Sequence, residues 1–195
     1  MTEPTQRHSR LKLALMFLLF LAPFAGAAIV TRFFPDLFPG GALNHGTLIS
    51  PARALPALVL RDAAGQAAAL PHKWTLLYLA PAACDEACAQ TVLLTWQVWH
   101  ALSKDRARVQ RVFLAPDAAA LAAARAHADP QNWDLQFVSD AAAPGQRAAD
   151  FFRPSDAQAL YLLDPQGNWV MTFSGVAEKD LYRDLKRILR FSQVG

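Results

Sequence analysis

The chain carries two kinds of hydrophobic pattern. Near its beginning, residues 13–30 read LALMFLLFLAPFAGAAIV, a continuous apolar run without a charged side chain. Such a run is about as long as a helix must be to cross the hydrocarbon core of a bilayer, and its proline and glycine are tolerable there. From about Ala57 onward, short apolar runs alternate with amphipathic stretches. The pattern therefore predicts one membrane-spanning helix followed by a domain of alternating strands and helices.

The second part of the chain predicts an α/β sandwich. Residues Trp74–Leu79 are continuously apolar, as in a central buried strand, and Glu178–Phe191 repeat apolar residues at helical spacing. Asp117 is positioned to cap an Ala-rich helix that ends near Asp129. A closing hairpin and helix after this alternation are typical of a thioredoxin-like sandwich. The other elements expected are strands at 57–60, 109–114, 135–138, 159–163 and 169–173, helices at 87–102 and 144–152, and turns at 62–65 and 164–167.

Charged residues around the apolar run indicate its orientation. Arg7, Arg10 and Lys12 precede the run, whereas only Arg32 follows it closely. By the positive-inside rule, the N-terminus is then cytoplasmic, and the rest of the chain lies outside, which in a bacterium means the inner membrane and the periplasm. The predicted segments are a cytoplasmic tail at 1–12, a transmembrane anchor at 13–30, an irregular leader at 31–55 and a thioredoxin-like extracytoplasmic domain at 56–195.

A cleaved signal peptide is the alternative for the apolar run. A basic start, an apolar stretch and the small residues Ala25-Gly26-Ala27 fit that pattern too. The run continues past this site to Val30, which favours an uncleaved anchor. Both interpretations export the folded domain.

Composition and charge limit the classes of binding partner that the chain can have. The chain has 195 residues, enough for one domain and an appendage. Its formal net charge is +3 and its sequence pI about 9.1, and the basic residues are dispersed rather than clustered with aromatic ones. So weak an excess predicts no nucleic-acid partner. The partner that composition does predict is the lipid bilayer, through the apolar helix.

Two cysteines, Cys84 and Cys88, carry the candidate chemistry. Two thiols are too few for a disulfide framework or a four-thiolate zinc site. The pair opens a helix, whose N-terminus favours a thiolate, while Asp85 and Glu86 either oppose this or cap the helix. Residues four apart share a helix face, so the pair can close a disulfide, most easily if Cys84 precedes the helix. With the same spacing, the two thiolates can bind one soft ion such as Cu(I). The pair can also form an inert structural disulfide.

A third copper ligand would have to come from elsewhere in the chain. His100 lies too far along the helix if that helix is continuous, and His127 is explained as a residue at a helix end. His45 and His72 lie in expected loops and stay open as ligands, although a surface role is the simpler interpretation. Met171 offers a soft sulfur, but methionine commonly fills cores.

From about Asn44 to its end, the chain resembles the Sco/SenC family of cytochrome oxidase assembly proteins. The resemblance rests on the membrane anchor, the C-x-x-x-C motif and the sequences WTLLY at 74–78, RVQRVFL at 108–114 and YLLDPQG at 161–167. The chain is more closely similar to the short Sco-like proteins that accompany oxidase genes in some proteobacteria. That similarity rests on NHGTLI at 44–49 and GNWVM at 167–171.

The resemblance implies site roles, and the sequence departs from the family at one of them. In Sco proteins, a histidine five residues before the hairpin tyrosine completes a copper site with the two cysteines. Here that position is Asp156, and carboxylate is a poor ligand for Cu(I). The proline that thioredoxins carry immediately before that strand is also missing, because Pro154 stands several residues too early. Of these departures, the one at Asp156 argues against stable copper binding and leaves dithiol exchange untouched.

We therefore expect a membrane-anchored extracytoplasmic dithiol protein that assists assembly of the copper site of cytochrome c oxidase by thiol–disulfide exchange, with Cys84 as the attacking thiol. Its expected partner is an oxidase subunit or a copper-binding assembly protein. One alternative is a Cu(I) carrier that uses Cys84 and Cys88. Another is a non-redox assembly or scaffold protein with a structural disulfide. Copper is the one cofactor that these hypotheses allow.

Overall fold

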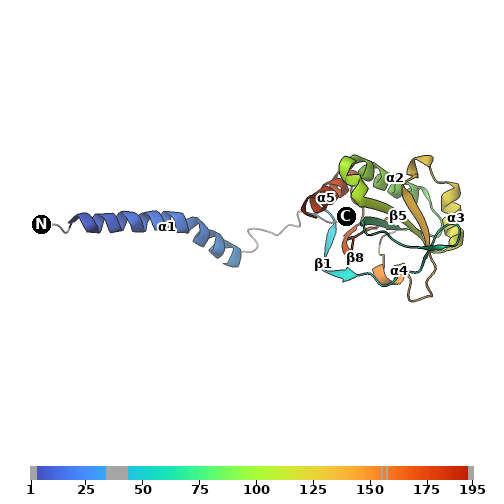
Figure 1. The fold of residues 1–195 in the computed structure, drawn as a ribbon, viewed down its shortest axis with the longest axis horizontal. Coiled ribbons are helices and arrows are strands. Elements are labelled where there is room, and N and C mark those ends of the chain that lie inside the picture. Colours follow the sequence, from blue (N-terminus) through green and yellow to red (C-terminus); the bar gives the residue numbers. More distant parts are fainter. Residues whose placement is uncertain (1–3, 34–43, 155, 157, 193–195) are drawn as a thin grey trace. The chain divides into compact units, whose positions relative to one another are not determined.

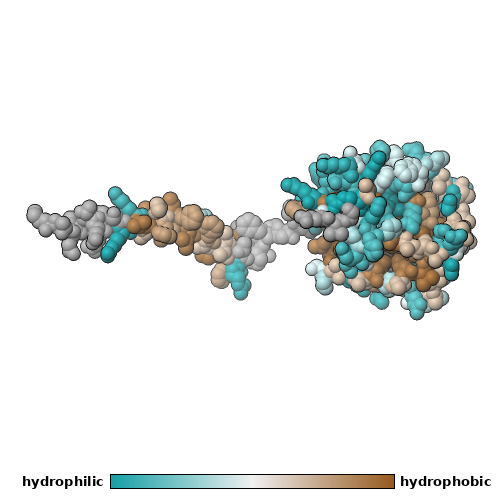
Figure 2. All heavy atoms as spheres, viewed as in Figure 1, coloured by the Kyte–Doolittle hydropathy of each residue, from teal (hydrophilic) through white to brown (hydrophobic). Residues whose placement is uncertain are grey.

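The computed structural model describes residues 4–33, 44–154, 156 and 158–192. The chain divides into two compact units, Met1–Leu43 and Asn44–Gly195 (Figure 1). Helix α1 (Pro4–Phe33) forms the described part of the first unit. Within it, Lys12–Val30 is by length and composition able to cross a membrane, and none of that stretch is buried. Figure 2 shows the apolar side chains along this helix. The expected N-terminal apolar helix is thereby confirmed.

A single mixed sheet of eight strands runs through the described part of the second unit, in the order β1-β8-β7-β4-β5-β6-β2-β3. Strand β4 (Trp74–Leu79) lies inside it, parallel to β5 and antiparallel to β7, and its first five residues are buried. A strand covered on both faces must be apolar on both, which explains the continuous apolar run. The remaining strands are β1 (Thr47–Ala54), β2 (Leu60–Arg61), β3 (Ala67–Ala68), β5 (Val109–Ala115), β6 (Leu135–Asp140), β7 (Leu160–Leu163) and β8 (Asn168–Phe173).

Helices cover both faces of the sheet and enclose two apolar clusters. On one face, α2 (Glu86–Ala101), α3 (Ala118–Ala126) and α5 (Glu178–Phe191) pack over alternate residues of the strands, such as Leu76 and Phe113. On the other face, α4 (Ala148–Phe152) packs over the intervening residues, such as Leu77 and Val112. Two short 3-10 helices, Ser103–Arg108 and Pro130–Asn132, complete the connections. The result is the expected α/β sandwich.

The structure differs from the expectation at the start of this unit. Residues 31–55 were expected to be irregular, but β1 lies within them and pairs antiparallel with β8. Its sequence contains Pro51, which the interior of a sheet does not tolerate. Strand β1 is an edge strand, and its pairing register shifts between Leu48 and Arg53, so the proline is accommodated. The compact unit therefore begins at Asn44 instead of residue 56.

A second difference concerns the strand expected at 57–60. The chain instead forms β2 and β3, joined by a turn in which the Gly65 amide donates to the Asp62 carbonyl oxygen at 3.0 Å. The predicted turn at 62–65 is thus confirmed, whereas the strand begins only at its last expected residue, Leu60.

Candidate redox site

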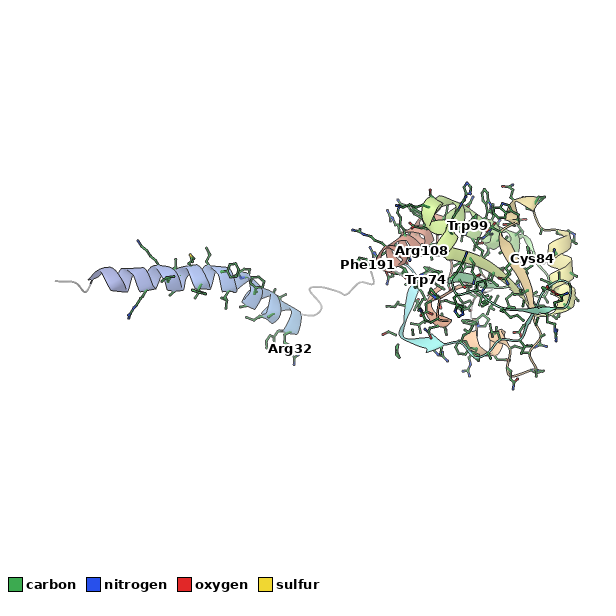
Figure 3. The ribbon with its side chains drawn as sticks, in the orientation of Figure 1. Arg32, Trp74, Cys84, Trp99, Arg108 and Phe191 are labelled. Atoms are coloured by element: carbon green, nitrogen blue, oxygen red, sulfur yellow. A yellow bond between two sulfur atoms is a disulfide. The ribbon has the colours of Figure 1, made fainter. Side chains whose placement is uncertain are left out.

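Cys84 and Cys88 lie at the junction between strand β4 and helix α2. Figure 3 labels Cys84. They form a disulfide whose Cα atoms are 5.2 Å apart, as their spacing allowed. Cys84 lies in the loop before the helix and is exposed, whereas Cys88 lies in the first turn and is only 1% exposed. Cys84 is therefore accessible from solvent, whereas Cys88 is shielded.

Asp85 fixes the start of helix α2 between the two cysteines. It is the N-cap residue, and its side chain accepts a hydrogen bond from the Cys88 amide at 2.9 Å. The capping role expected for an acidic residue here is confirmed. Its carboxylate also places negative charge beside the Cys84 sulfur, which opposes the stabilisation of a thiolate by the helix N-terminus.

Tyr78 lies near the end of β4. Its pKa is raised to about 12, chiefly by burial; a hydrogen bond with Thr91 lowers the pKa, and the charges of Asp85 and Asp156 raise it. The Thr91 hydroxyl also donates a hydrogen bond to the Ala87 carbonyl oxygen at 2.9 Å. Thr91 therefore connects the Tyr78 hydroxyl to the first turn of α2. Tyr78 thus stays protonated and neutral at physiological pH.

Asp156, at the family's histidine position, lies near the same end of the sheet. Its carboxylate accepts a hydrogen bond from the Gln158 amide at 2.8 Å, and the Gln158 side chain reaches the Ala87 carbonyl oxygen at 3.4 Å. This loop therefore contacts the beginning of α2. The charge of Asp156 also raises the pKa of Tyr161, whose pKa burial raises more strongly. Among the described residues, no group of three His, Cys, Asp or Glu side chains is arranged to hold a metal ion.

The histidines that the sequence left open lie elsewhere. His45 Nδ1 is 3.3 Å from Asp184 and its Nε2 is 3.2 Å from Asp180. His72 Nδ1 is 3.1 Å from the Pro165 carbonyl oxygen. His100 stacks on a tryptophan, and Met171 is buried in the core. None of these four side chains lines the cavity beside Cys84.

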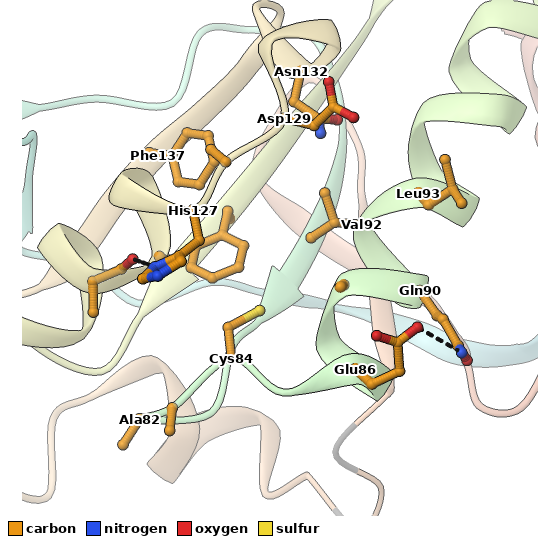
Figure 4. Close-up of a pocket in the computed structure, with 16 residues that line it drawn as sticks. Ala82, Cys84, Glu86, Gln90, Val92, Leu93, His127, Asp129, Asn132 and Phe137 are labelled. Atoms are coloured by element: carbon orange, nitrogen blue, oxygen red, sulfur yellow. Dashed lines mark hydrogen bonds between the residues drawn. The ribbon is translucent and has the colours of Figure 1, made fainter.

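A cavity of about 510 Å³ opens beside Cys84, between helices α2 and α3 (Figure 4). Phe113 and Phe137 line it from the sheet, with ring centroids 5.2 Å apart. His127 also lines it, with Nδ1 3.0 Å from the Ala123 carbonyl oxygen. The sequence placed His127 correctly at the end of a helix, but no local signal indicated that it would share a cavity with Cys84, because the packing of α3 against α2 decides this.

A dithiol at the junction of a central strand and its following helix, on a mixed sheet covered by helices, defines the thioredoxin-like class. The chain belongs to the family described as "Transmembrane-like, thioredoxin-like, C-terminal domain", whose profile matches residues 74–192. No curated protein matches the sequence.

Solved structures with a similar fold include Sco proteins. ScoI of Bradyrhizobium japonicum with copper bound has 22% sequence identity and a TM-score of 0.50, over 69% of this chain and 98% of that chain. Yeast Sco1 with copper bound has 18% identity and a TM-score of 0.59, over 71% and 94%. BsSco, a member of the Sco family of cytochrome c oxidase assembly proteins with a disulfide switch, has 14% identity and a TM-score of 0.54, over 73% and 96%. The expected thioredoxin-like fold is confirmed.

Proposed function

We propose that the chain is a membrane-anchored, extracytoplasmic dithiol protein that assists assembly of the copper site of cytochrome c oxidase by thiol–disulfide exchange. The observation that carries this proposal is the Cys84–Cys88 disulfide, which has one exposed and one buried sulfur at a helix N-terminus. The similarity to Sco proteins, one of which has a disulfide switch, favours an oxidase subunit or a copper-binding assembly protein as the client.

The exchange proceeds in two balanced steps. A client thiolate attacks the Cys84 sulfur, the Cys84–Cys88 bond breaks, and Cys88 leaves as a thiolate. The second client thiolate then attacks the client sulfur of the mixed disulfide, which closes the client disulfide and releases Cys84. Two electrons pass from the client dithiol to the protein, and the released thiolates take protons from water. The same steps run in reverse when the protein dithiol is the stronger reductant, and Cys84 is then the attacking thiol.

The surroundings of the two cysteines explain this division of roles. Cys84 is exposed in the loop, whereas Cys88 is 1% exposed within the first helical turn. Attack on the disulfide is therefore expected at Cys84, which solvent reaches, rather than at the buried Cys88. Cys88 lies in the first turn of α2, where the positive end of the helix dipole stabilises the thiolate that leaves.

Trapping of the mixed disulfide tests the proposal. The Cys88→Ser variant lacks the resolving thiol, so with a disulfide-bonded copper-binding domain of an oxidase subunit it should accumulate a mixed disulfide through Cys84. The Cys84→Ser variant keeps only the buried thiol and should accumulate at least tenfold less. Non-reducing electrophoresis after an alkylation quench measures both. Equal trapping by the two variants, or none by either, would show that Cys84 is not an exchange site.

The anchor is part of the same proposal. Leu18 and Leu19 of α1 are 72% and 76% exposed, and neither lies in a protein core. Exposing this much apolar surface to water is unfavourable. A bilayer would cover the apolar side chains along the whole Lys12–Val30 stretch. The charge bias around this stretch supports a cytoplasmic N-terminus, with the dithiol unit in an oxidising compartment.

A Cu(I) carrier is the second candidate, because two structures of similar fold hold copper. The dithiol form offers two soft sulfurs, but Asp156 is a hard oxygen ligand and already accepts a hydrogen bond from the Gln158 amide. The described residues thus do not fit a three-ligand copper site, and we derive no step through copper. We expect the reduced full chain to bind at most one Cu(I) through two thiolates, and Cu(II) weakly or not at all. A stoichiometric Cu(II) complex with a thiolate charge-transfer band in a titration would contradict this.

A further inference from the structure

The cavity beside Cys84 is one end of an apolar surface that folding alone does not explain. We call the cavity between α2 and α3 the α2–α3 groove; the residues that line it include Cys84, Val92, Leu93, Ala124, His127 and Phe137. Leu93 remains 50% exposed. Trp133 follows Asn132, another residue of the groove wall, and is 79% exposed. Its ring contacts Trp99 edge-on, with the ring centroids 6.0 Å apart. Exposed apolar area next to a concave apolar surface is typical of a binding site.

The position of Cys84 in the groove indicates which class of molecule binds there. Because Cys84 lines the groove and is exposed, a molecule that reacts with it places its own sulfur at the end of the groove. The rest of the incoming molecule, on either side of its own sulfur, must then lie along the groove or extend into solvent. In a polypeptide, the residues beside the cysteine are available to fill the apolar part over Phe137 and Leu93.

Charged residues at the edge of the groove further indicate which polypeptide segments it binds. Glu86 and Asp129 both line it, and each accepts a hydrogen bond from an amide group. Glu86 accepts from the Gln90 side chain at 3.1 Å, and Asp129 accepts from the Gln131 backbone amide at 2.8 Å. Neither carboxylate belongs to an ion pair among the described residues. Two such carboxylates attract a cationic side chain and repel an anionic thiol such as glutathione.

We propose that the α2–α3 groove binds the polypeptide segment around the client's reacting cysteine, and that it selects segments with apolar and basic residues beside that cysteine. This inference rests on the proposed exchange function and names the substrate class of the same site. The client therefore approaches on the α3 side of α2, away from the Gln158 loop on the other side of the helix. The bound segment holds the client thiolate at Cys84 and so raises the exchange rate over that of a free thiol.

Exchange kinetics test the proposal on the full chain, oxidised and held in lipid nanodiscs. The probes are a cysteine peptide flanked by Leu, Phe and Lys, a peptide flanked by Ser and Asp, and reduced glutathione. The apolar basic peptide should reduce the disulfide at least tenfold faster than the other two and show saturation. A peptide rate equal to that of glutathione, without saturation, overturns the groove while leaving exchange intact. If no thiol reduces the disulfide, the proposed function itself fails.

Matched variants locate the binding surface. Leu93→Asp should lower the rate with the apolar basic peptide about tenfold, clearly more than it lowers the rate with glutathione, which the added charge repels. Val59→Asp is the control, because Val59 is 49% exposed, compared with 50% for Leu93, and does not line the groove. Equal effects of the two substitutions on the peptide rate overturn the proposal. Thermal melts of both variants check folding, and Leu93→Gln is the milder variant for the case in which Leu93→Asp does not fold.

The charge component has its own variant. Asp129→Asn keeps the hydrogen bond to the Gln131 amide, because asparagine also caps helices, but removes the negative charge. It should slow the lysine-bearing peptide two- to threefold at low salt and leave a peptide with alanine in place of lysine unaffected. An equal change with both peptides overturns the proposed selection for basic segments. Dimerisation through the groove, or vesicle binding lost in Leu93→Asp, would assign the groove to a second copy or to lipid instead.

Discussion

Asp184 shows how a single buried side chain joins the beginning of the folded unit to its last helix. It is 1% exposed on α5, and one of its oxygens accepts hydrogen bonds from the amides of His45 at 2.6 Å and Gly46 at 2.9 Å. Gly46 has no room for a side chain, since a Cβ there would lie 2.5 Å from the ring of Phe173. The NHG sequence, which contributes to the resemblance to Sco-like proteins, therefore has a structural role here.

This contact gives a prediction at the residue scale. Asp184→Ala leaves two amides without their acceptor and removes one of the two carboxylates that contact the His45 ring, so it should lower the free energy of unfolding by about 3 kcal/mol. Asp180→Ala is the control, because Asp180 pairs with the same histidine but its side chain is 30% exposed, and this variant should lose less than about 1 kcal/mol. Denaturant melts measure both. Equal losses would mean that Asp184 does not hold the Asn44–Gly46 segment in place.

Arg111 marks what the sequence could not predict at this scale. It lies in a strand that the pattern predicted, yet it is 1% exposed. Its guanidinium donates to Asp134 at 3.0 Å, to Asn132 at 2.9 Å and to Thr95 at 3.1 Å. Burial lowers the pKa of Arg111, and Asp134 counteracts this. These partners come from a loop and a helix distant in sequence, so no local pattern could have indicated that a charged residue would be buried.

At the scale of elements, periodicity predicted most of the fold. Helices α2 and α5 and strand β4 lie within one residue of the predicted bounds, because each has a long apolar stripe or a continuous apolar run. Strand β1 was missed, since an edge strand that is exposed along nearly its whole length and contains proline lacks that signal. The dithiol loop was placed correctly by the same logic. The groove was not predicted, because it depends on how α3 packs beside α2.

Two substitutions of Asp85, the N-cap residue of α2, distinguish the effect of its charge from the effect of its capping hydrogen bond. Asp85→Asn keeps a side-chain acceptor for the Cys88 amide and removes the negative charge beside Cys84. Its stability should stay within about 0.5 kcal/mol of the original, while the pKa of the reduced Cys84 thiol should fall and its alkylation at neutral pH should become faster. Asp85→Ala should instead lose about 1 kcal/mol. Alkylation kinetics and denaturant melts provide the two readouts, and an unchanged alkylation rate in Asp85→Asn would show that this charge does not act on the thiol.

At the scale of the whole molecule, the proposed function requires the two units to lie in different environments. It places the apolar part of α1 in a bilayer and the disulfide in an oxidising compartment. A reporter that is active only after export, fused after Gly195, should be active, and a reporter that is active only in the cytoplasm should not. Activity of the cytoplasmic reporter at this position would contradict both the proposed orientation and the compartment.

The central claim is that Cys84 and Cys88 exchange, rather than hold the fold together. They are four residues apart, so their disulfide closes a very short loop and removes little entropy from the unfolded chain. A bond that adds so little stability is poorly suited to a structural role, whereas an exposed sulfur at a helix N-terminus suits exchange.

A redox titration of the full chain against a dithiol–disulfide buffer tests this claim most directly. Structural disulfides have reduction potentials below about −300 mV, whereas catalytic and regulatory ones lie higher. We predict a Cys84–Cys88 potential clearly above about −300 mV, with complete and reversible reduction. A potential below that value would contradict the account and identify the disulfide as structural.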